Sequence, residues 1–249
     1  MLIAAAVCPH PPLLVPAVAG AAAPELDALR AACREAVRRL IEGPGGRAPD
    51  LLVVVGGEAT TRAYAPDAAG SLRPYGVDVT VGPGEPVLPL SLTIGRWLLG
   101  QAVDPAPARV RFQGVAQAAP PRECLRLGRE LAGAAERVAL LVMGDGSACR
   151  AEKPGDDDLD ERAEPYDAAV ARALRDADAD ALAALDPVLS GELLVAGRAA
   201  WQVLAGATGA AGGADGHGGF HGGFTGALLA DVAPYGVAYF VASWLRGRP

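Results

Sequence analysis

Near its amino terminus the chain reads Val7-Cys8-Pro9-His10-Pro11-Pro12-Leu13-Leu14-Val15-Pro16, directly after the short apolar run 2–7. The apolar run predicts a buried strand, which the prolines end because proline cannot continue a ladder of backbone hydrogen bonds. His10 therefore follows the first strand on a stiff loop, at the end of the strand where open α/β sheets bind their ligands. Two interpretations are open: a rigidly held functional imidazole, or a turn in which His10 only hydrogen-bonds a neighbour.

Composition narrows the class of protein. With 249 residues, of which 51% are hydrophobic and 20% charged, the chain can bury the core of one α/β domain and is not globally disordered. Its net charge of −7 and dispersed arginines predict no nucleic-acid partner. Its longest apolar stretches contain prolines and are shorter than the ~20 residues a bilayer needs, so we expect no membrane partner and no signal peptide. Four widely spaced cysteines without a CxxC pair indicate reduced thiols and a cytoplasmic protein.

Apolar runs alternate with amphipathic segments along the whole chain, without an internal repeat or a linker. This pattern predicts one α/β domain over residues 1–249, with a mainly parallel or mixed sheet between helices. After the first strand, strands are predicted at 50–55, 77–81, 109–115, 137–143 and 237–244. Helices are predicted at 24–41, 88–99, 122–135, 165–175, 179–185 and 187–205.

Four loops are predicted to meet at one edge of this sheet. They are the His10 loop, the loop ending at Glu58, the Asp145–Arg150 loop, and the segment 231–236. Convergence of such loops is the general way in which α/β folds build a ligand site. We therefore expect a pocket with a polar lining made by His10, Glu58, Asp145, Ser147 and Tyr235.

Other kinds of site are disfavoured. No loop has the GxGxxG or Walker pattern, and the only lysine, Lys153, lies elsewhere. Gly144–Ala148 has alanine where a hydrolase nucleophile elbow needs its second glycine. The acidic run 156–158 is interpreted as solvated, and the glycine-rich stretch 208–223 as a mobile loop whose His217 and His221 bind no structural metal.

A family resemblance spans nearly the whole chain. The sequence resembles the LigB-like superfamily of class III extradiol ring-cleavage dioxygenases, to which the Memo proteins are related. The similarity rests on the order of several motifs: Pro9-His10-Pro11-Pro12, the strand and loop at 51–60, Gly144-Asp145-Gly146-Ser147, Tyr166-Asp167-Ala168-Ala169-Val170, Ala184-Leu185-Asp186-Pro187, the helix at 199–207, and Ala233-Pro234-Tyr235-Gly236-Val237-Ala238-Tyr239.

The resemblance implies an iron site and shows where this chain departs from it. In active members two histidines and a glutamate hold Fe(II), leaving positions open for a catecholate and dioxygen, and a further histidine moves protons. His10 matches the first ligand, whereas Glu58 stands at the position of the second histidine and Ala148 at that of the catalytic histidine. The closing glutamate falls near Asp231 or Val232, of which only Asp231 can bind a metal. An altered site for Fe(II) or a harder divalent metal would then consist of His10, Glu58 and Asp231.

Two classes of function follow from these departures. The first is a non-catalytic small-molecule-binding or interaction protein on the dioxygenase scaffold, with a degraded metal site and no cofactor. The alternative is a metal-dependent, non-haem-iron type of oxidoreductase that acts on a catechol-like aromatic with altered ligands. Because family members often associate, the resemblance also implies a homodimer.

Overall fold

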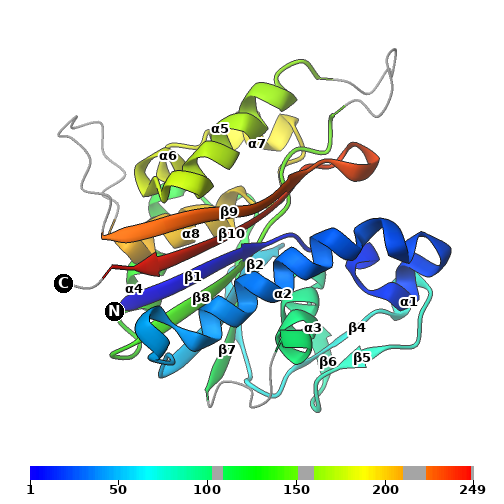
Figure 1. Ribbon diagram of the computed structural model, residues 1–249, viewed down its shortest axis with the longest axis horizontal. Helices are drawn as coiled ribbons and strands as arrows, with labels where there is room; N and C mark the ends of the chain where they lie inside the picture. Colours follow the sequence, from blue (N-terminus) through cyan, green and yellow to red (C-terminus); the bar gives the residue numbers. More distant parts are fainter. Residues whose placement is uncertain (103–108, 151–159, 210–222, 248–249) are drawn as a thin grey trace.

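The main sheet contains seven strands in the order β3-β7-β2-β8-β1-β10-β9 (Figure 1). The computed structural model describes residues 1–102, 109–150, 160–209 and 223–247. A small three-stranded sheet has the order β5-β4-β6. The strands span β1 (Leu2–Cys8), β2 (Leu51–Glu58), β3 (Arg62–Tyr64), β4 (Ala69–Ser71), β5 (Thr80–Val81), β6 (Pro86–Leu88), β7 (Val110–Ala116), β8 (Val138–Met143), β9 (Phe224–Val232) and β10 (Tyr239–Arg246).

Helices pack on both faces of the main sheet (Figure 1). One face carries α1 (Pro16–Ala19), α2 (Asp27–Glu42) and α3 (Leu90–Ala102). The other carries α4 (Pro121–Ala132), α5 (Ala163–Asp176), α6 (Ala179–Ala183), α7 (Pro187–Glu192) and α8 (Arg198–Thr208). Short 3₁₀ helices span Pro12–Leu14, Gly20–Leu26, Pro44–Gly46, Arg73–Tyr75 and Pro234–Gly236. The prediction of one α/β domain is confirmed.

The sheet is mixed, with its parallel strands in the middle. β7, β2, β8 and β1 run parallel to one another, whereas β3, β10 and β9 pair antiparallel with their neighbours. All residues of β1 and β8 are buried, because helices cover both faces of these strands. The carboxyl ends of the four parallel strands lie at one edge, and the β9–β10 connection lies there too.

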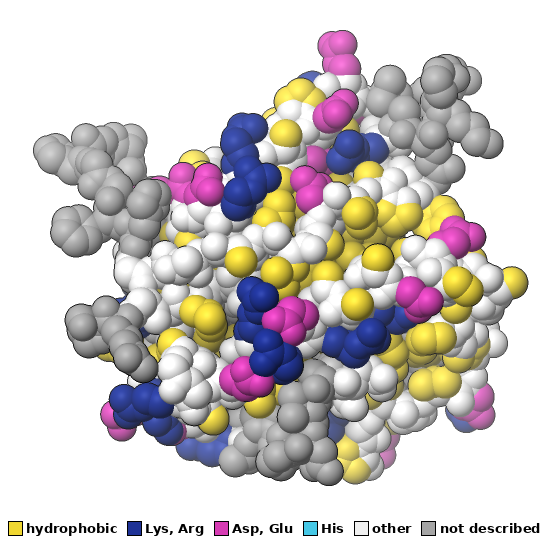
Figure 2. Space-filling view, viewed as in Figure 1, with side chains coloured by type: hydrophobic (Ala, Val, Ile, Leu, Met, Phe, Trp, Pro, Cys, Tyr) yellow, Lys and Arg dark blue, Asp and Glu magenta, His cyan; other side chains and the backbone are white. Residues whose placement is uncertain are grey.

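Helix α2 illustrates how the outer surface is built. Its buried residues include Leu29, Cys33, Val37 and Leu40, which follow the helical period and face the sheet. On its exposed side Arg38 pairs with Glu35 and Glu42, and Figure 2 shows basic and acidic side chains next to one another over this helix. No helix in the described parts of the chain is long and apolar enough to cross a membrane.

Four predicted elements need correction. The single helix predicted at 187–205 is wrong: α7 and α8 are separate, and between them Leu194 has a left-handed backbone with φ of 55°. Asp231 belongs to β9 rather than to a loop. The predicted helix 24–41 begins as the 3₁₀ turn that contains Pro24, because α2 starts at Asp27. Of the strand predicted at 77–81, only Thr80–Val81 pairs.

Two predictions lie outside the described residues. They concern the acidic run 156–158 and most of the stretch 208–223, including His217 and His221.

Helices α4 and α8 approach so closely that their backbones are in contact. A methyl group on Gly128 would lie 2.0 Å from the carbonyl oxygen of Val203, and one on Gly206 would lie 2.2 Å from that of Leu125. Backbone atoms cannot move aside as a flexible side chain can. Glycine at these two positions is therefore required by packing rather than by backbone conformation.

We expect Gly128→Ala to lower the free energy of unfolding by roughly 1–3 kcal/mol, the usual cost of overpacking, although alanine favours helices. The matched control is Gly100→Ala in α3, where a methyl group meets no atom within 4 Å. Gly100→Ala should leave stability unchanged or raise it by up to about 1 kcal/mol. Urea unfolding of both variants measures the difference, and wild-type stability of Gly128→Ala would contradict the packing argument.

Candidate functional site

The His10 and Asp145 loops lie side by side. Cys8 and Met143, the last residues of β1 and β8, are in register, and the Gly144 N–H donates to the Cys8 carbonyl at 3.0 Å. The backbone N–H of His10 donates to the Asp145 carboxylate at 2.7 Å. His10 Nδ1 lies 3.6 Å from the same oxygen, too far for a hydrogen bond, and it is buried with no hydrogen-bond partner among the described residues. Two residues predicted for the pocket are thus brought together.

Burial changes the pKa values of two groups at this place, Asp145 and Tyr239. Burial raises the pKa of Asp145, although the charge and the backbone N–H of His10 oppose this rise. Burial also raises the pKa of Tyr239, and the nearby Asp145 and Tyr235 add to the effect. Tyr239 follows the turn at the same edge of the sheet and is only 4% exposed. Sequence reasoning places it in a motif but not among the site residues.

Ser147 is turned into the interior. It is fully buried, and both its backbone N–H and its hydroxyl donate to the carboxylate of Asp167 in α5, at 3.0 and 2.6 Å. Burial raises the pKa of Asp167, and the two hydrogen bonds from Ser147 partly offset that rise. The Ser147 hydroxyl therefore fixes α5 to the strand-end loop.

Glu58 points away from His10. Its carboxylate accepts a hydrogen bond from the Tyr64 hydroxyl and pairs with Arg62 at 3.3 Å, both on β3. It also lies over Gly114 of β7, where an added methyl group would meet it at 2.3 Å. β7 and β1 are three strand spacings apart in the sheet, roughly 14 Å. The edge of the sheet is shared by Glu58 and His10, but their side chains occupy different parts of it.

Tyr235 and Asp231 lie at the β9–β10 connection. Tyr235 has a left-handed backbone, is 42% exposed, and donates its hydroxyl to Glu25 at 2.5 Å. Asp231 is exposed on the edge strand β9. In the described ranges no three histidine, cysteine, aspartate or glutamate side chains lie close enough to hold a metal ion. His10, Glu58 and Asp231 therefore do not fit the three-ligand iron site that the family resemblance implies.

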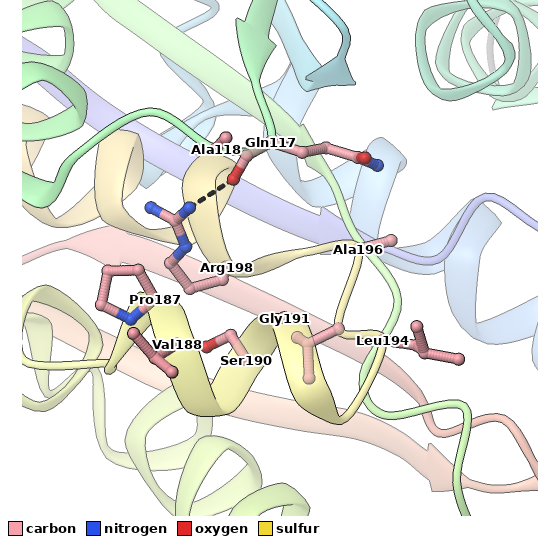
Figure 3. Close-up of a pocket in the computed structure, with 10 residues that line it drawn as sticks. Gln117, Ala118, Pro187, Val188, Ser190, Gly191, Leu194, Ala196 and Arg198 are labelled. Carbon is pink, nitrogen blue, oxygen red and sulfur yellow. Dashed lines mark hydrogen bonds between the residues drawn. The ribbon is translucent and has the colours of Figure 1, made fainter.

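A cavity of about 450 Å³ opens at the same edge, beyond the ends of β2 and β7 (Figure 3). One wall is the segment after β7, and the other is α7 with the connection to α8 (Figure 3). None of the residues predicted for the pocket lines it. Its lining consists of Gln117, Ala118, Pro187, Val188, Ser190, Gly191, Leu194, Val195, Ala196 and Arg198.

Arg198 holds the two walls of this cavity together. Its guanidinium donates to the carbonyl oxygen of Gln117 (Figure 3). It also donates to the carbonyl oxygen of Ala119 at 2.6 Å and to Oε1 of Gln202 at 3.0 Å. The hydroxyl of Ser190, another lining residue, hydrogen-bonds the Tyr166 hydroxyl of α5 at 2.8 Å. Sequence reasoning missed Arg198, although a single charged residue in the apolar run 193–201 was a signal for it.

Comparison with known proteins gives the fold but no family. No family model matches the chain, and no curated protein matches it. Among solved structures, it is similar to an uncharacterized protein, JW3007, from Escherichia coli K12. The identity is 15%, the match covers 98% of this chain and 99% of that one, and the TM-score is 0.54. At this identity the likeness supports a common fold alone.

The buried Asp167 makes stability depend on pH. Its pKa in the folded protein is raised above the ordinary value of 3.8, so its stabilising contribution is complete below that pH and declines as pH rises through the folded value. Asp167→Asn keeps the shape and can still pair with Ser147, but cannot ionise. We expect the free energy of unfolding of the wild type to fall relative to Asp167→Asn as pH rises above 3.8.

Denaturant unfolding of both proteins between pH 3 and pH 8 measures this difference. Asp176→Asn, at the exposed end of the same helix, controls for the loss of one negative charge. If the difference in the free energy of unfolding between wild type and Asp167→Asn stays constant across this pH range, the pKa of the buried carboxyl is not raised in the folded protein.

Proposed function

We propose that this chain is a small-molecule-binding protein on an extradiol-dioxygenase-like scaffold and that it does not cleave aromatic rings. The observation that carries the proposal is the cavity of about 450 Å³ at the carboxyl edge of the sheet. Its volume is within the range of small-molecule sites, and its lining is mainly apolar with a few polar groups. The position, beyond the ends of β2 and β7, is where α/β sheets bind ligands.

Two residues of this chain stand where the family has its catalytic histidines, and neither can do their chemistry. Extradiol chemistry of the family needs a second imidazole ligand and a base that takes a proton from the catechol. Glu58 replaces the ligand and is engaged by Tyr64 and Arg62, and Ala148 replaces the base. Loss of a general base alone typically costs about 10²–10⁴-fold in rate.

The competing proposal is a metal-dependent oxidoreductase with altered ligands. It is supported by His10, whose buried Nδ1 has no hydrogen-bond partner beside the Asp145 carboxylate. An imidazole nitrogen that makes no hydrogen bond to a described residue is free to coordinate a metal ion. The metal content of the purified protein, measured for wild type and His10→Ala, separates the two proposals: iron that is lost in the variant favours the oxidoreductase.

We expect no ring-opened product from protocatechuate, even after anaerobic loading with Fe(II), because neither Ala148 nor Glu58 can supply the missing imidazoles. Absorbance of the yellow product after admission of oxygen is the measurement. Product formed in proportion to protein, and abolished in His10→Ala, would contradict the proposal and show that the chain has rebuilt a catalytic site.

We expect Gly191→Leu to weaken the binding of a neutral aromatic probe, 2-naphthamide, by at least tenfold. Gly191 lines the cavity, and a methyl group added there meets no atom within 4 Å. A leucine side chain can therefore start from this position without a clash at its Cβ, and we expect it to occupy ligand space. Gly100→Leu is the matched control, since Gly100 is also an exposed helical glycine with open space but lies in α3. Calorimetric titration that gives equal affinities for wild type and both variants would exclude this cavity as the binding site.

A further inference from the structure

The cavity is lined by a single charged residue of the described chain, Arg198. The other lining residues are apolar or carry a neutral amide or hydroxyl, and none is acidic. Arg198 is only 3% exposed, so its charge is held inside the protein rather than in bulk water. The chain as a whole has a net charge of −7, so the positive charge at this cavity differs in sign from the overall charge of the protein.

Arg198 has no charged partner in the parts of the chain that the structure describes. It donates to two backbone carbonyls and to the side-chain oxygen of Gln202, and it also hydrogen-bonds the thiol of Cys124, whose pKa is raised by burial. All of these partners are neutral. No ion pair of a described carboxylate includes it. A guanidinium has five N–H donors, and the contacts of Arg198 to oxygen atoms use three of them. Burying a charge is costly unless it is paired, so the arrangement lacks a counter-charge.

The start of α8 adds to the positive potential at the same place. α8 begins at Arg198 and has eleven residues, and its N-cap, Gly197, provides no side-chain cap. The cavity is lined by Ala196 and Arg198, the residues on either side of that cap. The unpaired N–H groups of a first helical turn carry partial positive charge and favour anions. The partial positive charge of this helix end therefore adds to the positive charge of the Arg198 side chain.

We propose that the cavity binds a small organic monoanion, with a carboxylate next to Arg198 and an apolar body against Pro187, Val188 and Leu194. This inference rests on the proposed binding function and assigns the ligand its charge. The carboxylate supplies the counter-charge that Arg198 lacks, and the apolar wall excludes water, which strengthens the pairing. Val188 and Leu194 are 69% and 63% exposed, and such a ligand would cover them.

The test compares two probes of nearly the same shape, 2-naphthoate and 2-naphthamide, on the full chain at low ionic strength. We expect wild type to bind the carboxylate at least tenfold more tightly than the amide, as a charge-assisted hydrogen bond predicts. In Arg198→Gln this preference for naphthoate over naphthamide should disappear. Arg172→Gln, which removes an exposed arginine from α5, should keep the preference.

The outcomes separate the two proposals. Equal wild-type affinities for the two probes overturn the anion inference and leave the binding function intact. Absence of binding of either probe overturns both. Naphthoate affinity that survives in Gly191→Leu places the anion elsewhere and overturns the inference. If Arg198→Gln does not fold, the wild-type preference and its loss in Gly191→Leu still decide the question.

Discussion

The central constraint on this fold is that β1, β2 and β8 are covered by helices on both faces. Every residue of β1 and β8, and every residue of β2 up to Gly57, is buried. Polar side chains inside such strands would lose their hydration without compensation. Residues that carry chemistry can therefore appear only where the strands end. The His10–Asp145 pair, Glu58 and the cavity beyond β7 all lie at that edge because the rest of the sheet cannot hold them.

The sequence was informative where apolar runs end in glycine or proline. The main strands and most helices were predicted within a few residues, because Pro9 and Gly43 mark clear boundaries. The split between α7 and α8 was not visible, since the run Leu193–Gly197 is as apolar as the helices around it. The break comes from the left-handed backbone of Leu194, which a hydrophobic pattern does not encode. β9 was missed because its glycine and alanine residues give little strand signal.

The site was harder to predict than the fold. The convergence of strand-end loops followed from the order of the elements, and the contact between His10 and Asp145 agrees with it. The direction of each side chain did not follow. Glu58 accepts a hydrogen bond from Tyr64 on the short strand β3, which the sequence pattern did not predict. Ser147 donates to Asp167 of α5, a helix that packs on one face of the sheet. The partners of Glu58 are only four and six residues away, but they come from a strand that the sequence pattern did not predict, and the partner of Ser147 is twenty residues away in α5. A single sequence shows neither kind of partner.

The antiparallel pairing of β1 with β10 also determines how the chain can fold. Ala4 pairs with Leu245, so one of the central contacts joins segments separated by nearly the whole length of the chain. Contacts of this kind carry a large loop-closure entropy and slow folding. During synthesis β1 can pair with β8, but its other edge stays open until residues 239–246 leave the ribosome. In that interval a strand whose residues are all buried in the folded protein presents an unpaired edge, and the chain is then most exposed to aggregation and to chaperones.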